Sequence, residues 1–174
     1  MQSYKIIVYY GRGMFKIGLG YDFHVLEEGR PLMIGGIKIP FHKGEKAHSD
    51  GDVALHAIID ALLGASGIGG DIGELFPPND STWKDAPSSK LLSIAWNKIR
   101  ENGWKLGNID CIVIMEEPKL TPYREEIIKS ISNLLETETH RVFVKFKTHE
   151  KTGDIGKGDA IASFVTALLY NENI

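Results

Sequence analysis

The sequence has one cysteine, no excess of basic residues and no long apolar run, and each absence removes a class of protein. Cys111 is the only cysteine among 174 residues, so an intrachain disulfide and a cysteine-ligated metal cluster are excluded. It lies in the apolar run 109–115, so we expect a buried structural thiol rather than a nucleophile. No stretch approaches the roughly 20 apolar residues of a membrane-spanning helix. The net charge of −3 gives no basic field for nucleic acid.

The N-terminal segment has none of the marks of a targeting sequence. Its apolar run over residues 6–10 is too short for a signal peptide, and the segment is not rich in Ser and Arg as transit peptides are. We expect residues 1–13 to be an extension of unknown role and residues 14–174 to form a single domain. With 43% hydrophobic and 25% charged residues, a cytoplasmic protein of bacterial type is the expectation.

Patterns along the chain predict an α+β fold, with a single mixed sheet and helices packed on one face. Strands are expected over residues 15–21, 109–115 and 142–147, and a hairpin-like pair over 32–39. Helices are expected over residues 53–65, 88–102 and 160–170, and another begins at Thr121 and Pro122. The polar segment 41–48 is expected to be a mobile loop.

Two imidazoles and one carboxylate form a candidate metal site. Asp22 and His24 stand at i and i+2 in a strand-like segment, so their side chains point to the same side. His56 comes from a predicted buried helix. Three protein ligands leave a tetrahedral metal one open position, where chemistry can occur. Zinc suits such a site, and so does ferrous iron held by two histidines and a carboxylate. The alternative is that His56 is a buried histidine satisfied by Asp60.

The residues around His56 also allow two interpretations. Asp52 and Asp60 stand at i−4 and i+4 on the same helical face, and either could accept the second imidazole N–H. Ser49 precedes the helix and is either its cap or a phosphate contact, because backbone N–H groups at a helix N-terminus bind anions. His140, which is next to Arg141, is expected at the surface.

The motifs that contain these residues resemble those of the 2-C-methyl-D-erythritol 2,4-cyclodiphosphate synthase family. The similarity runs from about residue 15 to residue 170, with several long motifs in the same order and spacing. The matching segments are residues 18–24, 48–57, 60–65, 70–73, 76–77, 108–110, 118–120, 145–150 and 156–158. The resemblance implies a small α+β domain that assembles as a homotrimer, with active sites between subunits.

The resemblance also implies a reaction. The family is a phosphorus–oxygen lyase of the non-mevalonate isoprenoid pathway that acts on 4-diphosphocytidyl-2-C-methyl-D-erythritol 2-phosphate. The 2-phosphate attacks the β-phosphorus, which closes a cyclic diphosphate and releases CMP. Both reacting groups are phosphates, so the enzyme must neutralise charge and hold an in-line geometry. The nucleophile is already an anion, which agrees with the absence of a Ser/His/Asp or Cys/His set.

The family's functional residues carry over to matching positions of this sequence. The resemblance implies that Asp22, His24 and His56 bind Zn²⁺ and that Glu150 binds Mg²⁺ or Mn²⁺. His48 and Thr148 match residues that orient phosphates and stabilise the transition state. The implied substrate-binding residues are Asp22, Phe23, His24, His48, Ser49, Asp71, Ile72, Gly73, Phe76, Asp80, Met115, Pro118, Lys119, Leu120, Lys147, Thr148, Glu150 and Lys157. Within this set, residues 71–76 match the polyol and ribose segment, and residues 115–121 match the cytosine pocket.

Some positions depart from the family pattern. The family usually has Arg where Lys157 stands, so a two-pronged phosphate contact becomes a single ammonium. Pro78, Lys147 and Asp154 also depart, which affects secondary contacts and not the metal ligands. Without the family resemblance, Glu150 would be expected to be a surface carboxylate. Two alternatives stay open: a ferrous-iron oxygenase, and a non-catalytic metal-stabilised trimer that binds nucleotides or isoprenoid phosphates.

Overall fold

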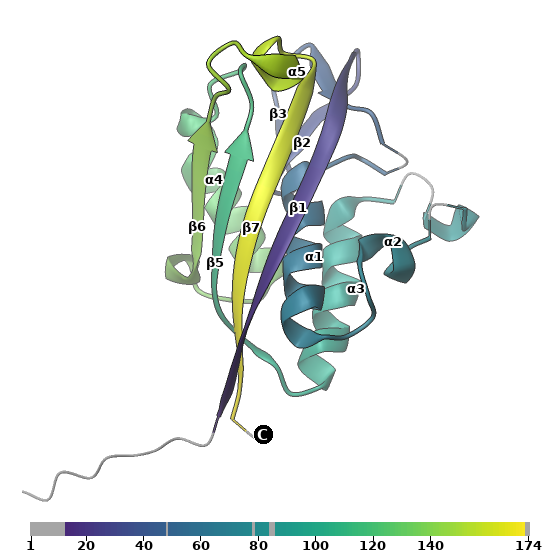
Figure 1. The fold of residues 1–174 in the computed structure, drawn as a ribbon, viewed down its shortest axis with the longest axis vertical. Coiled ribbons are helices and arrows are strands. Elements are labelled where there is room, and N and C mark those ends of the chain that lie inside the picture. The colour runs from purple at the N-terminus through teal and green to yellow at the C-terminus, as the bar shows by residue number, and fades with distance from the viewer. Residues whose placement is uncertain (1–12, 48, 78, 84–85, 173–174) are drawn as a thin grey trace, which may run out of the picture.

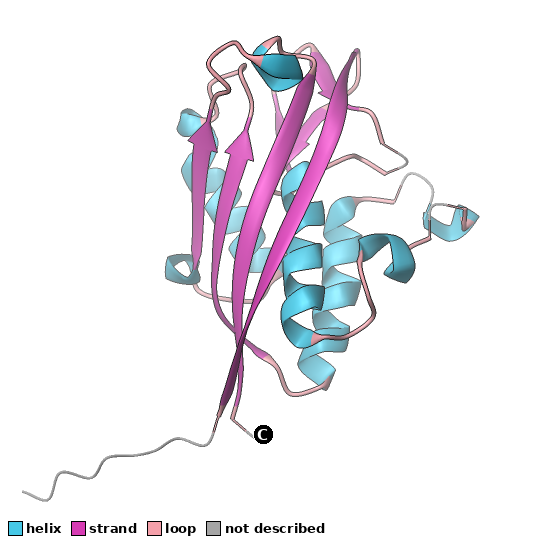
Figure 2. Cartoon of the chain, viewed as in Figure 1, coloured by secondary structure: helices cyan, strands magenta, loops and turns pink. Residues whose placement is uncertain are grey.

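A computed structural model describes residues 13–47, 49–77, 79–83 and 86–172. It consists of a twisted sheet with a layer of helices on one side (Figures 1 and 2). The strands are β1 (Met14–Glu28), β2 (Leu32–Ile34), β3 (Ile37–Ile39), β4 (Lys43–Glu45), β5 (Lys105–Ile114), β6 (Val142–Lys147) and β7 (Ala160–Asn171). The helices are α1 (Val53–Ser66), α2 (Ile72–Leu75), α3 (Ser88–Glu101), α4 (Arg124–Leu134) and α5 (Gly153–Gly156), with 3₁₀ turns η1 (Ser81–Trp83), η2 (Thr121–Tyr123) and η3 (Thr139–Arg141).

The main sheet is mixed, which confirms the predicted α+β class. Its strand order is β4-β1-β7-β5-β6. Only β5 and β6 run parallel, joined through α4, and the other pairs are antiparallel. Helix α1 packs against β1, β7 and β5, while α3 packs on α1. Strands β2 and β3 form a separate two-stranded sheet, so the prediction of a single sheet is wrong. None of the described helices is long and apolar enough to cross a bilayer.

The helix predicted over residues 160–170 is wrong, because this segment is the strand β7. β7 lies inside the sheet, where it pairs antiparallel with β1 on one side and with β5 on the other. Its alternate residues Ser163, Val165 and Ala167 are buried. A short, continuous apolar run suits a buried strand as well as a buried helix. Partners that are distant in the sequence therefore decided its conformation.

The other predicted elements are confirmed with changes at their ends. The predicted helices at 53–65 and 88–102 are α1 and α3, the strand at 142–147 is β6, and the hairpin at 32–39 is β2 and β3. Strand β1 continues to Glu28, so Asp22 and His24 lie within it. Pro122 falls in η2, which leads directly into α4. The segment 41–48 was expected to be a loop, but its described part contains β4.

The packing of α1 on β1 depends on two glycines. Gly18 and Gly20 are buried at alternate positions of β1 that face α1, and Asp22 and His24 follow on the same side. A Cβ added at Gly18 or Gly20 would lie only 1.9 Å or 1.8 Å from carbonyl oxygens of α1. The helix and strand backbones are therefore in direct contact. Because of this contact, the first turn of α1, which contains His56, lies beside Asp22 and His24.

The opposite side of β1 is apolar and exposed. Its side chains form the outer apolar row, which we define as Phe15, Ile17, Leu19, Tyr21, Phe23 and Val25. Ile17 is 75% exposed and Leu19 is 67% exposed. Contiguous apolar patches of this kind mark interaction surfaces, because monomeric proteins rarely leave them in water.

Gly20→Ala tests the contact between helix and strand. The new methyl group would have to push α1 away from β1, so we expect a loss of about 3 kcal/mol in unfolding free energy and weaker metal binding. Gly64→Ala is the matched control, since a Cβ there meets nothing within 4 Å on the exposed side of α1. That variant should be neutral or gain up to about 1 kcal/mol. Chemical denaturation measures both, and equal stability of the two variants would contradict the argument.

Candidate functional site

Three metal-ligating side chains meet where β1 passes the first turn of α1. Asp22 Oδ2 lies 2.9 Å from His24 Nε2 and 2.9 Å from His56 Nδ1. The two imidazole nitrogens are 3.1 Å apart. Within the described ranges, this is the one group of three or more His, Cys, Asp or Glu side chains whose donor atoms all lie within 4.8 Å of one another. The structure therefore brings together the three residues predicted to form the metal site.

The donor set fits a divalent metal ion. Ligand atoms around tetrahedral zinc stand about 3.3 Å apart, given zinc–nitrogen bonds of about 2.0–2.1 Å. The donors need to spread only slightly from their present separations of 2.9–3.1 Å. The side chains of Asp22, His24 and His56 are 25%, 17% and 10% exposed, so the group is sheltered yet reachable. A His/Asp metal-binding group is thus present in the fold.

The charge state of Asp22 suits this role. Burial alone would raise its pKa, but hydrogen bonds and charge attraction from His24 and His56 outweigh burial. The pKa of Asp22 is therefore held well below its ordinary value. The carboxylate is ionised at neutral pH, so a metal ion need not compete with a proton for it.

The hydrogen-bond partners predicted for His56 are wrong. Asp52 is the N-cap of α1, where its carboxylate accepts the backbone N–H of Leu55 at 3.0 Å. Asp60 accepts the backbone N–H of Ile72 at 2.8 Å. Both carboxylates stand at helical spacing from His56, but each serves a backbone group of a neighbouring segment. The ring nitrogens of His56 instead contact Asp22, His24, Ser49 and Ser88, so the alternative in which Asp60 satisfies a buried His56 is wrong.

Two serine hydroxyls contact His56 instead. Ser88 Oγ lies 2.9 Å and Ser49 Oγ lies 3.2 Å from His56 Nε2. Ser49 does not cap α1, which corrects one of its two predicted roles, because Asp52 is the cap. The backbone N–H of Gly51 donates to Ser49 Oγ at 3.1 Å. Sequence reasoning missed Ser88, which is 32 residues from His56 and has no motif to mark it.

A cleft of about 830 Å³ opens beside the metal-binding group. Seven of the residues predicted for the site line it: Asp22, His24, Ser49, His56, Ile72, Gly73 and Phe76. Trp83 and Leu91 add apolar wall, and Lys46, which pairs with Glu27 at 3.2 Å, also lines it. The fold therefore joins the predicted metal ligands to the segment predicted to hold the polyol and ribose.

Of four other predicted residues, three stand outside the lining of this cleft. Asp71 is exposed and caps α2, accepting the backbone N–H of Glu74 at 2.8 Å. Asp80 is exposed, and hydrogen bonds from the Thr82 hydroxyl and then from the Thr82 backbone N–H lower the pKa of Asp80. Phe23 belongs to the outer apolar row, on the other side of β1. The fourth, at position 48, lies outside the described residues.

The remaining predicted residues form a second group at the far side of the sheet. They are Met115, Pro118, Lys119, Leu120, Lys147, Thr148, Glu150 and Lys157. All but Lys157 lie at or just beyond the ends of β5 and β6, and β7 and β5 separate β1 from β6. Lys157 ends α5, just before β7. At about 4.8 Å per strand, β1 and β6 are about 14 Å apart. Glu150 accordingly does not join the group of Asp22, His24 and His56.

Hydrogen bonds connect residues within the loops that carry the second group. Thr148 Oγ1 donates to Glu150 Oε1 at 3.1 Å. Glu116 Oε2 accepts the backbone N–H of His149 at 3.3 Å and that of Lys151 at 3.4 Å. Glu116 thus ties the loop after β5 to the loop after β6. It is a positioning contact that sequence reasoning did not identify.

Buried acids near the cap of α1 are structural. Glu45 is fully buried, accepts the backbone N–H of Met33 at 3.3 Å, and has a pKa raised to about 9 by burial and by the charge of Asp52. Burial raises the pKa of Asp52 to about 6.

The Cys111 thiol is buried and its pKa is raised to about 12, again by burial. This confirms the predicted structural thiol, because a nucleophile needs a thiolate.

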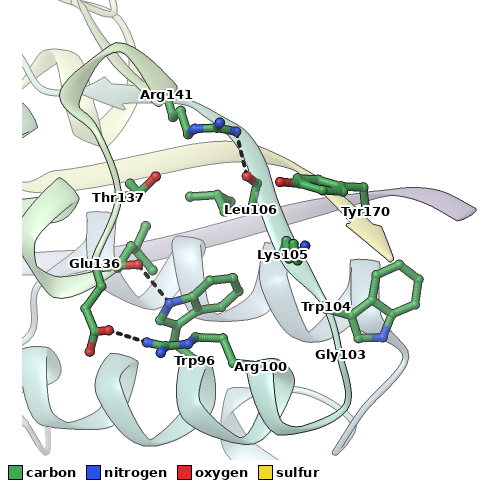
Figure 3. Close-up of a pocket in the computed structure, with 11 residues that line it drawn as sticks. Trp96, Arg100, Gly103, Trp104, Lys105, Leu106, Glu136, Thr137, Arg141 and Tyr170 are labelled. Carbon is green, nitrogen blue, oxygen red and sulfur yellow. Dashed lines mark hydrogen bonds and ion pairs between the residues drawn. The ribbon is translucent and has the colours of Figure 1, made fainter. Parts of the chain in front are cut away.

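Another depression, of about 440 Å³, lies at the end of the sheet where β1 begins and β7 ends (Figure 3). Its cationic residues are already engaged. Arg100 pairs with Glu136, and the Arg141 guanidinium donates to the carbonyl oxygen of Leu106 (Figure 3). None of the lining residues belongs to the metal-binding group. The cleft beside Asp22 is therefore the candidate active site.

Comparisons with known proteins agree with this geometry. The YgbB family model matches residues 15–170. A 2-C-methyl-D-erythritol 2,4-cyclodiphosphate synthase of Treponema denticola is 59% identical over 155 residues, which are 89% of this chain and 96% of that protein. A solved 2C-methyl-D-erythritol-2,4-cyclodiphosphate synthase with CDP bound has a TM-score of 0.82 at 40% identity, covering 88% of this chain and 99% of that one.

The bifunctional IspDF of Campylobacter jejuni has a TM-score of 0.87 at 41% identity, covering 91% of this chain. The chain spans only 43% of that protein. The fold and site define an α+β enzyme with a His/Asp metal-binding group, and the chain belongs to the YgbB family. The Treponema denticola relative named above is a 2-C-methyl-D-erythritol 2,4-cyclodiphosphate synthase, which confirms the family predicted from the sequence motifs.

His56→Ala tests the metal site directly. Removal of one of three ligands should leave the protein with almost no bound metal after dialysis, as measured by inductively coupled plasma mass spectrometry. His140→Ala is the matched control, because His140 is an exposed imidazole in η3. The control should keep the metal content of the unmodified chain. Undiminished metal in His56→Ala would disprove the assignment.

Proposed function

We propose that this chain converts 4-diphosphocytidyl-2-C-methyl-D-erythritol 2-phosphate into 2-C-methyl-D-erythritol 2,4-cyclodiphosphate and CMP. The observation that carries the proposal is the opening of the Asp22, His24 and His56 group into one cleft with Ser49 and residues 72–76. Family membership supports the same reaction and argues against the oxygenase and the non-catalytic trimer considered from the sequence.

The reaction is an intramolecular phosphoryl transfer. An oxygen of the 2-phosphate forms a new bond to the β-phosphorus, and the bond from that phosphorus to the oxygen bridging to the α-phosphate breaks. The bridging oxygen leaves with CMP and keeps the electron pair. Because the nucleophile is already an anion, the protein's task is to align the groups and offset their charge. No general base is needed.

The chain's own groups can meet these demands. Ser49 Oγ already accepts the Gly51 N–H and faces His56 Nε2, so its hydroxyl proton is available to donate to a phosphate oxygen. Asp71 can accept hydroxyl hydrogen bonds from the polyol. Gly73 lines the cleft without a side chain, so a ligand can approach its backbone closely. Trp83 and Leu91 limit the access of water to this side of the cleft.

Asp22, His24 and His56 would hold Zn²⁺, and Glu150 would hold Mg²⁺ or Mn²⁺. Such ions polarise phosphate oxygens and offset their charge when bound. His48 and Thr148 are proposed to orient phosphates. Lys147 and Lys157, both exposed, are proposed phosphate contacts, and Phe23 and Asp80 are proposed substrate-binding residues.

We further propose that the cytosine is bound by the loop that contains Met115, Pro118, Lys119 and Leu120. A rigid loop can read a pyrimidine edge through its backbone groups. Leu120 is buried and the Met115 N–H donates to the Lys147 carbonyl oxygen at 3.0 Å, which fixes the loop at both ends. A CDP-bound structure of a similar synthase supports a cytidine nucleotide as ligand.

The two groups of site residues are separated within one chain, so we propose a homotrimer with active sites between subunits. The metal-binding cleft of one subunit would face residues 115–120 and 147–157 of its neighbour. The outer apolar row supports this arrangement, because burial between subunits would remove it from water. Residues 14–174 are proposed as the one domain of this subunit, and the cytoplasmic location stays a prediction.

Release of CMP tests the proposed reaction. With Zn²⁺ and Mg²⁺ supplied, we expect CMP and the cyclic diphosphate in equal amounts, measured by liquid chromatography. A chelator should stop both, and added metal should restore them, because charge on the phosphates would otherwise be uncompensated. Absence of CMP with both metals present would refute the proposal.

Mixed trimers test the division of the site between subunits. His56→Ala and Glu150→Gln chains, carrying different affinity tags, would be co-expressed and purified through both tags. Each variant alone should be inactive. In a closed ring of three, a mixed trimer has one interface that joins two unmodified halves, so we expect about one third of full turnover. Inactive mixed trimers would contradict the shared site without affecting the proposed reaction.

A further inference from the structure

Ser88 connects the metal-binding group to a carboxylate that touches none of its ligands. Ser88 is the first residue of α3 and is completely buried. Its Oγ lies 2.9 Å from His56 Nε2. The same hydroxyl donates to Asp50 Oδ1, and the Ser88 backbone N–H donates to Asp50 Oδ2 at 3.1 Å. Asp50, Ser88 and His56 therefore form a continuous hydrogen-bonded chain that ends at a predicted metal ligand.

The donors and acceptors available in Asp50, Ser88 and His56 determine the direction of each hydrogen bond between them. A serine hydroxyl has one proton to donate. Because Asp50 as a carboxylate only accepts, that proton points to Asp50, and only a lone pair of Ser88 Oγ faces His56. His56 Nε2 must then be the donor. With Nε2 protonated, Nδ1 is the ring nitrogen that can offer a lone pair to a metal ion, and it faces Asp22 Oδ2 and His24 Nε2.

We propose that Ser88, held by Asp50, is a positioning residue that presents His56 Nδ1 to the metal ion. The inference rests on the metal site of the proposed function. Metal-bound histidines usually donate their other N–H to an acceptor that fixes the ring and raises its basicity. Here the acceptor is a neutral hydroxyl, and the carboxylate acts on the imidazole through it.

Ser49 is less suited to this task. Its Oγ is also near His56 Nε2, at 3.2 Å, but Ser49 lines the cleft and is the proposed phosphate contact. Ser88 does not line the cleft and is buried completely, so its hydroxyl is engaged whether or not substrate is bound.

Ser88 has two donors, its backbone N–H and its side-chain hydroxyl, and only the hydroxyl can act on the metal-binding group. The backbone N–H that reaches Asp50 helps to satisfy the start of α3, and every residue except proline keeps this group. The Oγ–H alone orients the acceptor for His56. Removal of the hydroxyl should therefore weaken metal binding more than it weakens the fold.

Ser88→Ala in the full chain tests the proposal. Zinc affinity would be measured by competition with a chromophoric chelator, without substrate. We expect binding to weaken about 10- to 100-fold, with little change in the denaturation midpoint of the metal-free protein. Ser93→Ala is the matched control on α3, because Ser93 Oγ donates to the Ser89 carbonyl oxygen. It should bind zinc as the unmodified chain does.

Asp50→Asn is the second variant. The Asn side chain has one acceptor oxygen for two Ser88 donors, so its NH₂ must face one of them. If the NH₂ group faces Ser88 Oγ, the serine hydroxyl turns its proton toward His56 Nε2. This favours the His56 tautomer that is protonated on Nδ1, which cannot bind metal through that atom. Zinc affinity should fall at least as far as in Ser88→Ala.

Two results would overturn the proposal. One is zinc affinity within twofold of the unmodified chain in either variant, and the other is an affinity loss accompanied by an equal loss of stability in the metal-free protein. If neither variant folds, nitrogen-15 NMR of the zinc-loaded unmodified chain decides. A slowly exchanging His56 Nε2–H supports the proposal, and rapid exchange with water refutes it. None of these measurements requires turnover, so an absence of CMP release would leave them interpretable.

Discussion

The site depends on the direct contact between β1 and α1. Gly18 and Gly20 let the strand lie against the helix backbone, where any Cβ would come within 2 Å of a carbonyl oxygen. The next two residues on that face of the strand are Asp22 and His24, and the helix turn that they meet carries His56. A wider spacing between the two elements would separate the three donors that a metal ion needs. The fold and the metal-binding group are therefore specified by the same contact.

The single chain brings together one half of the predicted site and leaves the other half on a distant part of the sheet. The cleft joins the metal-binding group to the segment around Gly73, whereas Thr148 and Glu150 follow β6, beyond β7 and β5. The outer apolar row covers the face of β1 that no helix reaches. A second copy seated on that row would account for both features, as the proposed homotrimer requires.

Two carboxylates beside the cleft are bonded to specific backbone partners. Asp52 receives the backbone N–H groups of Gly35, Gly36 and Leu55, and Asp60 receives that of Ile72. The bonds of Asp52 attach α1 to the β2–β3 hairpin, and the bond of Asp60 fixes the cleft wall at Ile72 and Gly73 to the helix that carries His56. Buried polar groups without such partners would cost free energy, and their pairing gives the site one arrangement.

The sequence by itself determined the family, the three side chains of the metal-binding group and most helices and strands. Asp22, His24 and His56 were identifiable because strand alternation and helix position are local properties that the sequence displays. Tertiary structure alone decided that residues 160–170 form a strand, since pairing with β1 and β5 outweighs an ambiguous apolar pattern. It also gave His56 the hydroxyl of Ser88, 32 residues away, where helical spacing had suggested Asp52 or Asp60. Contacts between distant segments depend on how elements pack, and no periodicity within one segment records them.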